Sequence, residues 1–452
     1  MSTEPLERTE PEDPEHSIGQ AWYVVAVLMV VYVFSFADRQ ILVLMVEDLK
    51  TGLGLTQDWQ VSILMGPAFA IFYAIFGFPL GRLADRTQRR SVVAAGLTVW
   101  SLLAAGCGVA RNFWQMALFR IGVGVGEASL SPSAYSLISD YFPKRLMATA
   151  ISVYSTGIYI GTGLALLMGG AVIVYAKTGT AWNLPIFGTI DPWQQVFVIV
   201  GLAGVLVVPL LYTFPEPRRR GAGPQQPVPL PEVAAYLKAN WQTITCHTLG
   251  FALLSFSSYG SGAWTPTYYI RNFGWTQGQT AFWNGIVIMI FGTLGITIGG
   301  RLADRLAKQG HRDAKMRVGF IASVVWFPFG IAFPLMPTAW LALAVSVGSV
   351  LTASMPFGVA AAAIQEMMPN RMRGQASAIY LFGITMIGMA FGPTILAILS
   401  DYVFGQDRIQ FSLVTVGTVA HVLSAIFLWT GLKHFVRSLD YLAQWTASES
   451  AE

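Results

Sequence analysis

Four ionisable residues lie deep inside apolar stretches of the sequence: Asp38, Arg39, Arg120 and Glu127. A charge at membrane depth costs at least about 2.5–3.5 kcal/mol, so a partner or a function must offset it. Asp38 and Arg120 have similar depths in their predicted helices, which predicts that they pair. Glu127 lies two turns beyond Arg120, about 10 Å deeper, with no cation predicted at its level. Desolvation favours the protonated carboxyl there, so we predict Glu127 as the main proton carrier and Asp38 as a second one.

The two arginines suggest a second kind of chemistry. Their planar guanidinium groups suit a phosphate or a carboxylate, so we predict that Arg39 and Arg120, together with Ser131, bind an anionic substrate. The simpler alternative is that these charges only form a salt bridge between two helices. The predicted facing wall, at 341–364, carries no charge. One ionic wall and one apolar wall favour an amphiphile over a sugar.

The composition indicates which elements position these residues. Of 452 residues, 54% are hydrophobic and only 12% are charged, whereas soluble domains carry about 25% charged residues. Apolar stretches long enough to span a bilayer, each of about 20 residues, recur along the chain. The net charge is +4, but the sequence contains no basic run with interleaved aromatic residues, which excludes a nucleic-acid partner. The sequence therefore predicts an all-α integral membrane protein.

We expect twelve transmembrane helices in two bundles of six. The predicted domains are a tail at 1–19, a bundle at 20–215, a linker at 216–240, a bundle at 241–437 and a tail at 438–452. The predicted helices span 20–46, 58–84, 91–110, 113–139, 146–174, 193–214, 241–271, 279–306, 316–336, 338–367, 372–400 and 409–437. The linker is rich in Pro, Gly and charge, which is incompatible with a membrane span.

Basic residues predict the orientation. With both termini inside, the predicted cytoplasmic segments hold 21 Lys and Arg residues and the external loops hold 5. Such an excess marks the cytoplasmic side. The acidic N-terminus is unlike the basic start of a signal peptide, so we expect a retained, disordered cytoplasmic tail. These features predict a multi-pass protein of the cytoplasmic (inner) membrane with both termini in the cytoplasm.

The sequence contains an internal repeat. The run GRLADR occurs at 81–86 and again at 300–305, each time at the predicted cytoplasmic end of the second helix of a bundle. Two parallel six-helix repeats place a substrate site at their interface near the bilayer midplane, with alternating access by rocking of the halves. This arrangement predicts a carrier rather than a static pore.

The repeated GRLADR run resembles the loop motif of the major facilitator superfamily. Within that superfamily, FADRQIL at 36–42 and RIGVGVGEASLSPSAYSLISDYFPKR at 120–145 resemble the spinster family of lysolipid and sphingolipid transporters. The resemblance implies a major facilitator fold with two pseudo-symmetric bundles. It also implies that the motif controls the conformational equilibrium. The conformational gating residues carried over are Gly81, Asp85, Arg86, Gly300, Asp304 and Arg305.

These observations predict a secondary active, proton-linked transporter of an anionic amphiphile, such as a lysophospholipid or a sphingolipid-like molecule. The alternatives are a symporter of small organic anions, an exporter of hydrophobic drugs, and a lipid sensor or scramblase on the same scaffold. Neither a GxGD nor a GxSxG motif with a placed histidine is found, so we do not expect an enzyme. We expect no metal and no cofactor, a proton gradient as the driving force, membrane lipids and the amphiphile as partners, and a monomer.

Overall fold

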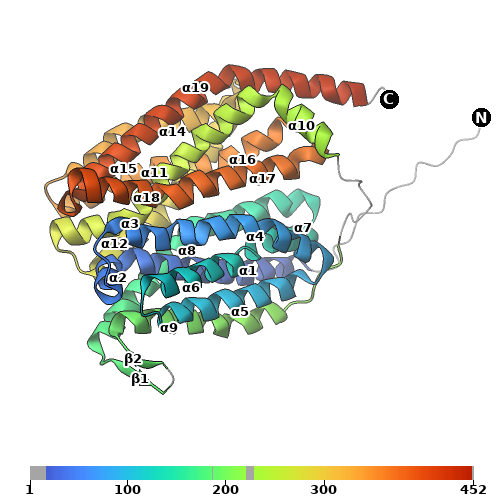
Figure 1. Cartoon of the computed structure of the whole chain (residues 1–452). Coiled ribbons are helices and arrows are strands. Elements are labelled where there is room, and N and C mark those ends of the chain that lie inside the picture. The colour runs from blue at the N-terminus through green and yellow to red at the C-terminus, as the bar shows by residue number, and fades with distance from the viewer. Residues whose placement is uncertain (1–16, 186, 220–228, 450–452) are drawn as a thin grey trace, which may run out of the picture.

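The predicted all-α membrane fold is confirmed. A computed structural model describes residues 17–185, 187–219 and 229–449. Twelve membrane-spanning helical segments form two bundles, one above the other in Figure 1. The disordered tail that we expected at the N-terminus falls mostly on residues 1–16, which lie outside the described residues, as do linker residues 220–228.

The first bundle contains the N-terminal six spans. Its elements are α1 (Ile18–Leu44), α2 (Val46–Leu53), α3 (Asp58–Met65), α4 (Pro67–Arg86), α5 (Arg89–Cys107), α6 (Phe113–Glu127), α7 (Leu130–Tyr141), α8 (Lys144–Thr178), β1 (Trp182–Leu184), β2 (Gly188–Ile190), α9 (Pro192–Val207) and η1 (Val208–Tyr212). The second span consists of α3 and α4, and the fourth consists of α6 and α7. Strands β1 and β2 pair in antiparallel fashion.

The second bundle repeats the arrangement with the C-terminal six spans. Its elements are α10 (Leu230–Ala239), α11 (Trp241–Phe273), α12 (Gln277–Val287), η2 (Ile288–Gly292), α13 (Thr293–Lys308), α14 (Ala314–Ala332), η3 (Phe333–Leu335), α15 (Ala339–Ser354), α16 (Pro356–Glu366), η4 (Asn370–Met372), α17 (Arg373–Gly383), η5 (Ile384–Ala390), α18 (Phe391–Leu399), η6 (Ser400–Phe404), η7 (Gln406–Arg408) and α19 (Ile409–Glu449). The short helix α10 precedes the six spans.

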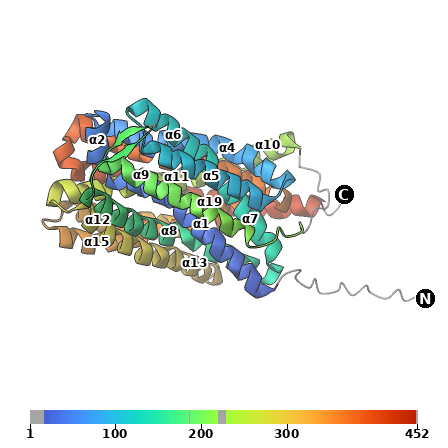
Figure 2. The ribbon, with the colours of Figure 1, turned by 90° about the horizontal axis from the view of Figure 1, so that it is seen from below.

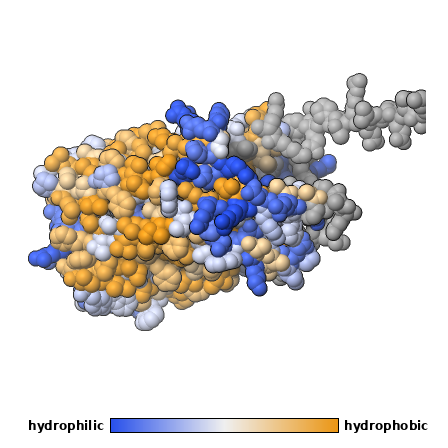
Figure 3. All heavy atoms as spheres, turned by 90° about the horizontal axis from the view of Figure 1, so that it is seen from above, coloured by the Kyte–Doolittle hydropathy of each residue, from blue (hydrophilic) through white to orange (hydrophobic). Residues whose placement is uncertain are grey.

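The two ends of the molecule differ. The N-terminal end of α1, the C-terminal end of α19 and helix α10 lie at one end, here called the terminal end, and the β1–β2 hairpin lies at the opposite end, called the hairpin end (Figures 1 and 2). One face of the surface between them is largely hydrophobic, and its hydrophilic residues gather toward the terminal end (Figure 3). This distribution is that of a molecule whose middle contacts lipid.

Ten of the spans are long and apolar enough to cross a membrane. The two spans that do not meet this criterion are α6–α7, at 113–141, and α11. They carry polar residues in mid-span, including Arg120 and Glu127 in α6 and a series of serines in α11. Mid-span polar residues thus lower the apolarity of these two spans.

Several spans are interrupted where the sequence predicts continuous helices. The second span breaks at Gly66, where a Cβ would lie 2.7 Å from the carbonyl oxygen of Ala390 in the other bundle. Only glycine permits this approach. Wide π-type turns, η2 and η5, interrupt the eighth and eleventh spans. Such turns are local features of tertiary packing that apolar periodicity does not encode.

Glycines allow close packing between the helices. A Cβ on Gly124 would lie 2.5 Å from the carbonyl oxygen of Phe69, and one on Gly299 would lie 2.2 Å from that of Met355. Between the bundles, Gly163 of α8 and Gly285 of α12 approach each other's carbonyl groups in the same way. Close contacts of this kind are typical of membrane helices.

The structure contains elements that the sequence reading omitted. Helix α2 and the β-hairpin lie at the hairpin end, where Arg111 holds the hairpin by donating to the carbonyls of Phe187 and Thr189 at 2.6 and 2.7 Å. At the terminal end, α10 packs against the long α19 through the rings of Tyr236, Tyr441 and Trp445. Helix α19 therefore continues to Glu449, beyond the predicted end at 437.

Candidate functional site

A cavity lies between the two bundles. The space between its walls is about 1490 Å³, which includes a part that is open to solvent. Side chains of α1, α3 and α8 line it from the first bundle, and side chains of α11, α12, α14, α15 and α16 line it from the second. Among the described lining residues, Arg39 is the only charged one. Aromatic and aliphatic side chains form most of the remaining wall.

Arg39 forms an ion pair with Glu127. Its Nη2 donates to Oε1 of the carboxylate, whose side chain is only 2% exposed, while Arg39 is 15% exposed and borders the cavity. The guanidinium also lies over the rings of Phe36 and Phe69, at 5.0 and 4.4 Å from their centroids. These contacts present one edge of a desolvated cation to the cavity.

A second ion pair lies behind the first. Arg120 donates to Asp38 through Nη1 and to the carbonyl oxygen of Leu64 through Nε, the latter at 3.1 Å. Its side chain is 1% exposed, and its guanidinium lies 5.2 Å from the centroid of Phe69. The predicted pairing of Asp38 with Arg120 is therefore confirmed. We call the two pairs, Arg39–Glu127 and Arg120–Asp38, the central ion pairs.

Each member of the central ion pairs retains a polar atom without a hydrogen-bond partner. These atoms are Asp38 Oδ1, Arg39 Nε, Arg120 Nη2 and Glu127 Oε2. Unsatisfied charged groups at this depth are costly. The cluster is neutral as a whole but incompletely bonded, so it is suited to accept another ligand or a proton.

Three expectations from the sequence need correction. Glu127 does have an adjacent cation, because the long side chain of Arg39 reaches it from α1. Arg120 does not border the cavity; its Nε and Nη1 donate to Leu64 and Asp38 within the first bundle. Ser131 does not border the cavity either; its hydroxyl bonds to that of Tyr73 at 3.2 Å. Of the predicted anion-binding residues, only Arg39 faces the cavity.

The opposite wall is less apolar than predicted. Helices α11, α12 and α15 contribute hydroxyl and amide side chains to it: Ser257, Ser258, Ser261, Thr265, Asn284, Ser346, Ser349 and Ser354. The sequence shows these residues individually, but only the packing of three helices brings them to one surface. The wall is uncharged, as expected, but it offers hydrogen bonds.

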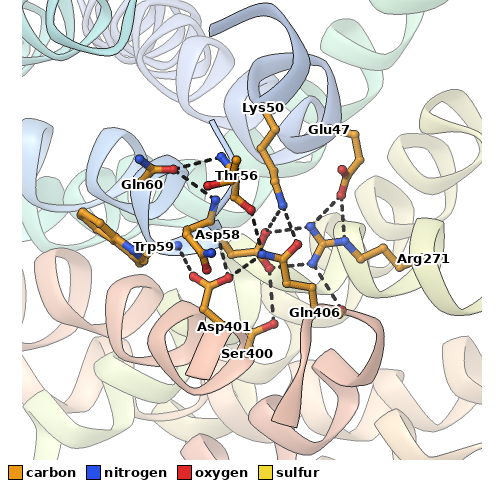
Figure 4. Close-up of polar contacts among 11 residues, drawn as sticks. Glu47, Lys50, Thr56, Asp58, Trp59, Gln60, Arg271, Ser400, Asp401 and Gln406 are labelled. Atoms are coloured by element: carbon orange, nitrogen blue, oxygen red, sulfur yellow. Dashed lines mark hydrogen bonds and ion pairs between the residues drawn. The ribbon is translucent and has the colours of Figure 1, made fainter. Parts of the chain in front are cut away.

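At the hairpin end, a network of charged residues joins the two bundles (Figure 4). Its centre is Asp58, which is fully buried. The carboxylate of Asp58 accepts from Arg271 Nη1 and Nη2 at 2.6 and 2.8 Å, from Lys50 Nζ at 3.0 Å and from Ser400 Oγ at 3.3 Å. Arg271 also pairs with Glu47, which is half exposed. Lys50 and Glu47 belong to the first bundle, as Asp58 does, whereas Arg271 and Ser400 belong to the second.

Asp401 completes this network from the second bundle. Its two carboxylate oxygens accept from the backbone N–H groups of Asp58 and Trp59 at 2.9 and 2.8 Å. A carboxylate of one bundle thus caps the N-terminus of helix α3 in the other, where anions are favoured. Gln406 bonds to Lys50 and Asp401 at 2.7 and 2.6 Å. We call Glu47, Lys50, Asp58, Arg271, Asp401 and Gln406 the hairpin-end network.

The hairpin-end network was not predicted from the sequence. Two of the five basic residues outside the predicted cytoplasmic segments and spans, Lys50 and Arg271, belong to it. Basic residues are rare on this side, and Asp58 and Asp401 lie at predicted helix ends on the same side. Together these features were the signal in the sequence for a charged network there. The sequence does not show that both bundles direct these residues to one point.

The residues predicted to act in gating lie at the terminal end. Asp85 and Asp304 are exposed, and within the described part of the chain neither accepts a hydrogen bond nor forms an ion pair. The better-bonded residue of this region is Arg89, which is 1% exposed. It pairs with Asp140 and with Glu216, and Glu216 also accepts from the N–H groups of Arg89 and Arg90 at 3.1 Å each. The start of the linker is thereby attached to the first bundle.

Comparison with known proteins supports this architecture. Residues 28–393 match the family model of the Major Facilitator Superfamily. An "MFS-type efflux pump" of Mycolicibacterium smegmatis is 27% identical over 94% of this chain and 95% of its own length. "Protein spinster homolog 1" of Homo sapiens is 23% identical over 94% of this chain and 84% of its own.

A solved structure has the same fold. The inward-facing, unoccupied structure of a bacterial homologue of the human lysosomal transporter Spinster superposes with a TM-score of 0.75 and 23% identity. The match covers 95% of this chain and 99% of that one. The resemblance to spinster proteins noted in the sequence is confirmed as a resemblance.

Proposed function

The chain belongs to the major facilitator superfamily, and on that premise we propose that it is a proton-linked secondary transporter of an anionic amphiphile. The observation that carries the proposal is the position of Arg39, the one charged side chain among the described residues of the cavity wall. The surrounding wall is largely aromatic and aliphatic, which suits an acyl or alkyl chain. The family is one of transporters rather than enzymes.

The Arg39–Glu127 pair supports a coupling between anion and proton. An anionic group that enters the cavity competes with Glu127 for the guanidinium of Arg39. Glu127 is then a buried carboxylate without a cation, and protonation removes that cost. One anion and one proton thus replace one internal ion pair. Asp38 keeps its own partner, Arg120, and serves as the second proton site.

The proposed orientation has the terminal end in the cytoplasm of a bacterial cell, because this end carries most of the basic residues. The structure then represents an inward-facing state. The hairpin-end network closes the external side by joining the bundles. At the terminal end, the predicted gating carboxylates Asp85 and Asp304 are exposed and unengaged, as expected if they act in the outward-facing state. We also propose that a single chain, embedded in membrane lipid, is sufficient.

A second candidate function is the export of hydrophobic drugs. The efflux pump of M. smegmatis is similar over nearly the full length of both chains. A neutral or cationic drug, however, gains nothing from Arg39 and leaves the Arg39–Glu127 pair intact. A small organic anion is a third candidate, which would use Arg39 but not the apolar wall.

Transport into proteoliposomes tests the proposal. Wild-type protein and Arg39→Gln are supplied with a lysophospholipid, a short dicarboxylate and a neutral drug, with and without a pH gradient. We expect uptake of the lysophospholipid alone, stimulated by the gradient and reduced at least tenfold in Arg39→Gln. Transport of only the dicarboxylate, or drug transport that ignores Arg39→Gln, would refute the amphiphile proposal.

A further inference from the structure

The cavity wall formed by the second bundle has more hydrogen-bonding groups than its own helices use. On α11, Ser257, Ser258, Ser261 and Thr265 are spaced at i, i+1, i+4 and i+8, which places them on one face of the helix. All four border the cavity. We call these four residues the hydroxyl face. Ser349 of α15 borders the same space.

The hydroxyl face and Ser349 differ from the other serines and threonines that border the cavity. In helices, such hydroxyls commonly bond to a carbonyl one turn earlier. Ser346 bonds in this way to the carbonyl of Leu343 at 2.7 Å, and Ser354 to that of Leu351 at 3.0 Å. By contrast, within the described residues, the side chains of the hydroxyl face and of Ser349 make no hydrogen bond.

Burial makes this difference significant. Ser257 is 2% exposed and Ser349 is 8% exposed, so bulk water has little access to either. Neither hydroxyl is among the fully buried side-chain atoms without a partner, so both are open to the cavity and can bond to a molecule within it. Two helices of the second bundle therefore hold unbonded hydroxyls toward the same cavity, opposite the wall that carries Arg39.

We propose that the hydroxyl face and Ser349 form a second polar subsite, which binds the uncharged hydroxyl, ester or amide groups next to the anionic group of the substrate. This inference rests on the proposed function and specifies the substrate class further. No charged residue borders this side of the cavity among the described residues, so the subsite selects a neutral group. Hydroxyls both donate and accept, which suits a glycerol-like moiety.

The location of the subsite adds a consequence for the transport cycle. Arg39 belongs to the first bundle, whereas α11 and α15 belong to the second. A substrate with an anionic group and a neutral polar group contacts both bundles at once. A substrate with only the anionic group contacts the first bundle through polar bonds and the second through apolar contacts alone. The bridging substrate is therefore the one that binds more tightly.

Binding of two ligands with the same chain length tests the inference. Oleoyl lysophosphatidic acid carries a phosphate, a hydroxyl and an ester, whereas oleyl phosphate carries only the phosphate. Dissociation constants are measured by calorimetry on the purified full chain in lipid nanodiscs, for wild type and for Ser257→Ala/Ser349→Ala. We expect wild type to prefer lysophosphatidic acid by about tenfold, as two neutral hydrogen bonds predict.

In the double variant, this preference should fall to about twofold or less, while the affinity for oleyl phosphate stays unchanged and reports an intact fold. Ser346→Ala is the matched control, because it removes a hydroxyl from the same helix and cavity that already bonds to its own backbone; its preference should equal that of wild type. Equal wild-type affinities for the two ligands, or an equal loss of both in the double variant, would overturn the subsite. Absence of binding by both ligands, or binding by both that is unaffected by Arg39→Gln, would instead overturn the proposed function.

Discussion

The central ion pairs and the hairpin-end network are both made of buried or partly buried charges, but they are bonded differently. The central ion pairs lie within the first bundle, and each of their four side chains has an unpartnered polar atom. The hairpin-end network joins the two bundles, and both carboxylate oxygens of Asp58 accept hydrogen bonds. An incompletely bonded cluster responds to a proton or a ligand at small cost. A fully bonded cluster between two bodies holds them in one arrangement.

The largest expected effect comes from breaking the proton site. Glu127→Gln removes the proposed proton carrier and leaves Arg39 without a carboxylate partner. We expect proton-driven accumulation to be lost, while binding of the anionic substrate persists because Arg39 is released. Uptake measured between pH 5.5 and 8 should then be independent of the gradient. Transport with the pH dependence of wild type would rule out Glu127 as the main proton site.

The next effect concerns the network between the bundles. Asp58→Asn removes the charge that pairs with Arg271 and Lys50, and breaking a buried pair costs about 3–5 kcal/mol. A cost of that size is sufficient to shift a two-state equilibrium by at least 100-fold. Spin-label distances across the hairpin end, measured by double electron–electron resonance, should lengthen. Glu47→Gln is the matched control, because its half-exposed pair contributes about 1 kcal/mol or less; equal shifts in both variants would contradict the central role of Asp58.

Substitutions of the two arginines of the central ion pairs distinguish a residue that binds the substrate directly from one that only stabilises the ion pairs. Lysine retains the charge but loses the planar fork. Because Arg39 borders the cavity and Arg120 does not, Arg39→Lys should weaken the binding of lysophosphatidic acid by about tenfold and Arg120→Lys by about threefold. Binding to both purified variants is compared with wild type. A larger loss in Arg120→Lys would restore the original expectation that Arg120 contacts the substrate.

The smallest effect is expected at the terminal end. Asp85→Asn and Asp304→Asn change exposed carboxylates without a partner in this state, so unfolding stability should change by no more than about 0.5 kcal/mol. If these carboxylates stabilise the outward-facing state, the variants should shift the equilibrium toward the inward-facing state by about threefold. A shift of that size corresponds to the loss of a weak charge interaction. Distances across the terminal end measure this shift. An unchanged distance distribution in both variants would show that Asp85 and Asp304 of the GRLADR motif do not control the conformational equilibrium in this chain.

Much of the architecture follows from local properties of the sequence. Apolar length predicts the spans because a helix in lipid must satisfy its own backbone hydrogen bonds. The repeat of GRLADR predicts two bundles, and matched depths in α1 and α6 predict the pairing of Asp38 with Arg120. Each of these inferences depends on position along one helix or on the comparison of two segments, and the structure agrees with each.

What the sequence alone determined, then, is the membrane fold, its two halves and the residues that carry charge at depth. Only the tertiary structure decided which of them meet. Asp38 and Arg39 are consecutive, so their side chains point about 100° apart around α1. Asp38 therefore pairs with Arg120, and Arg39 pairs with Glu127. The hydroxyl face and the hairpin-end network likewise depend on how the helices of both bundles pack. The depth of a residue along its helix can be predicted from the local sequence. Its contact partner depends on which helix packs against the face that carries it, and that is decided by the tertiary structure.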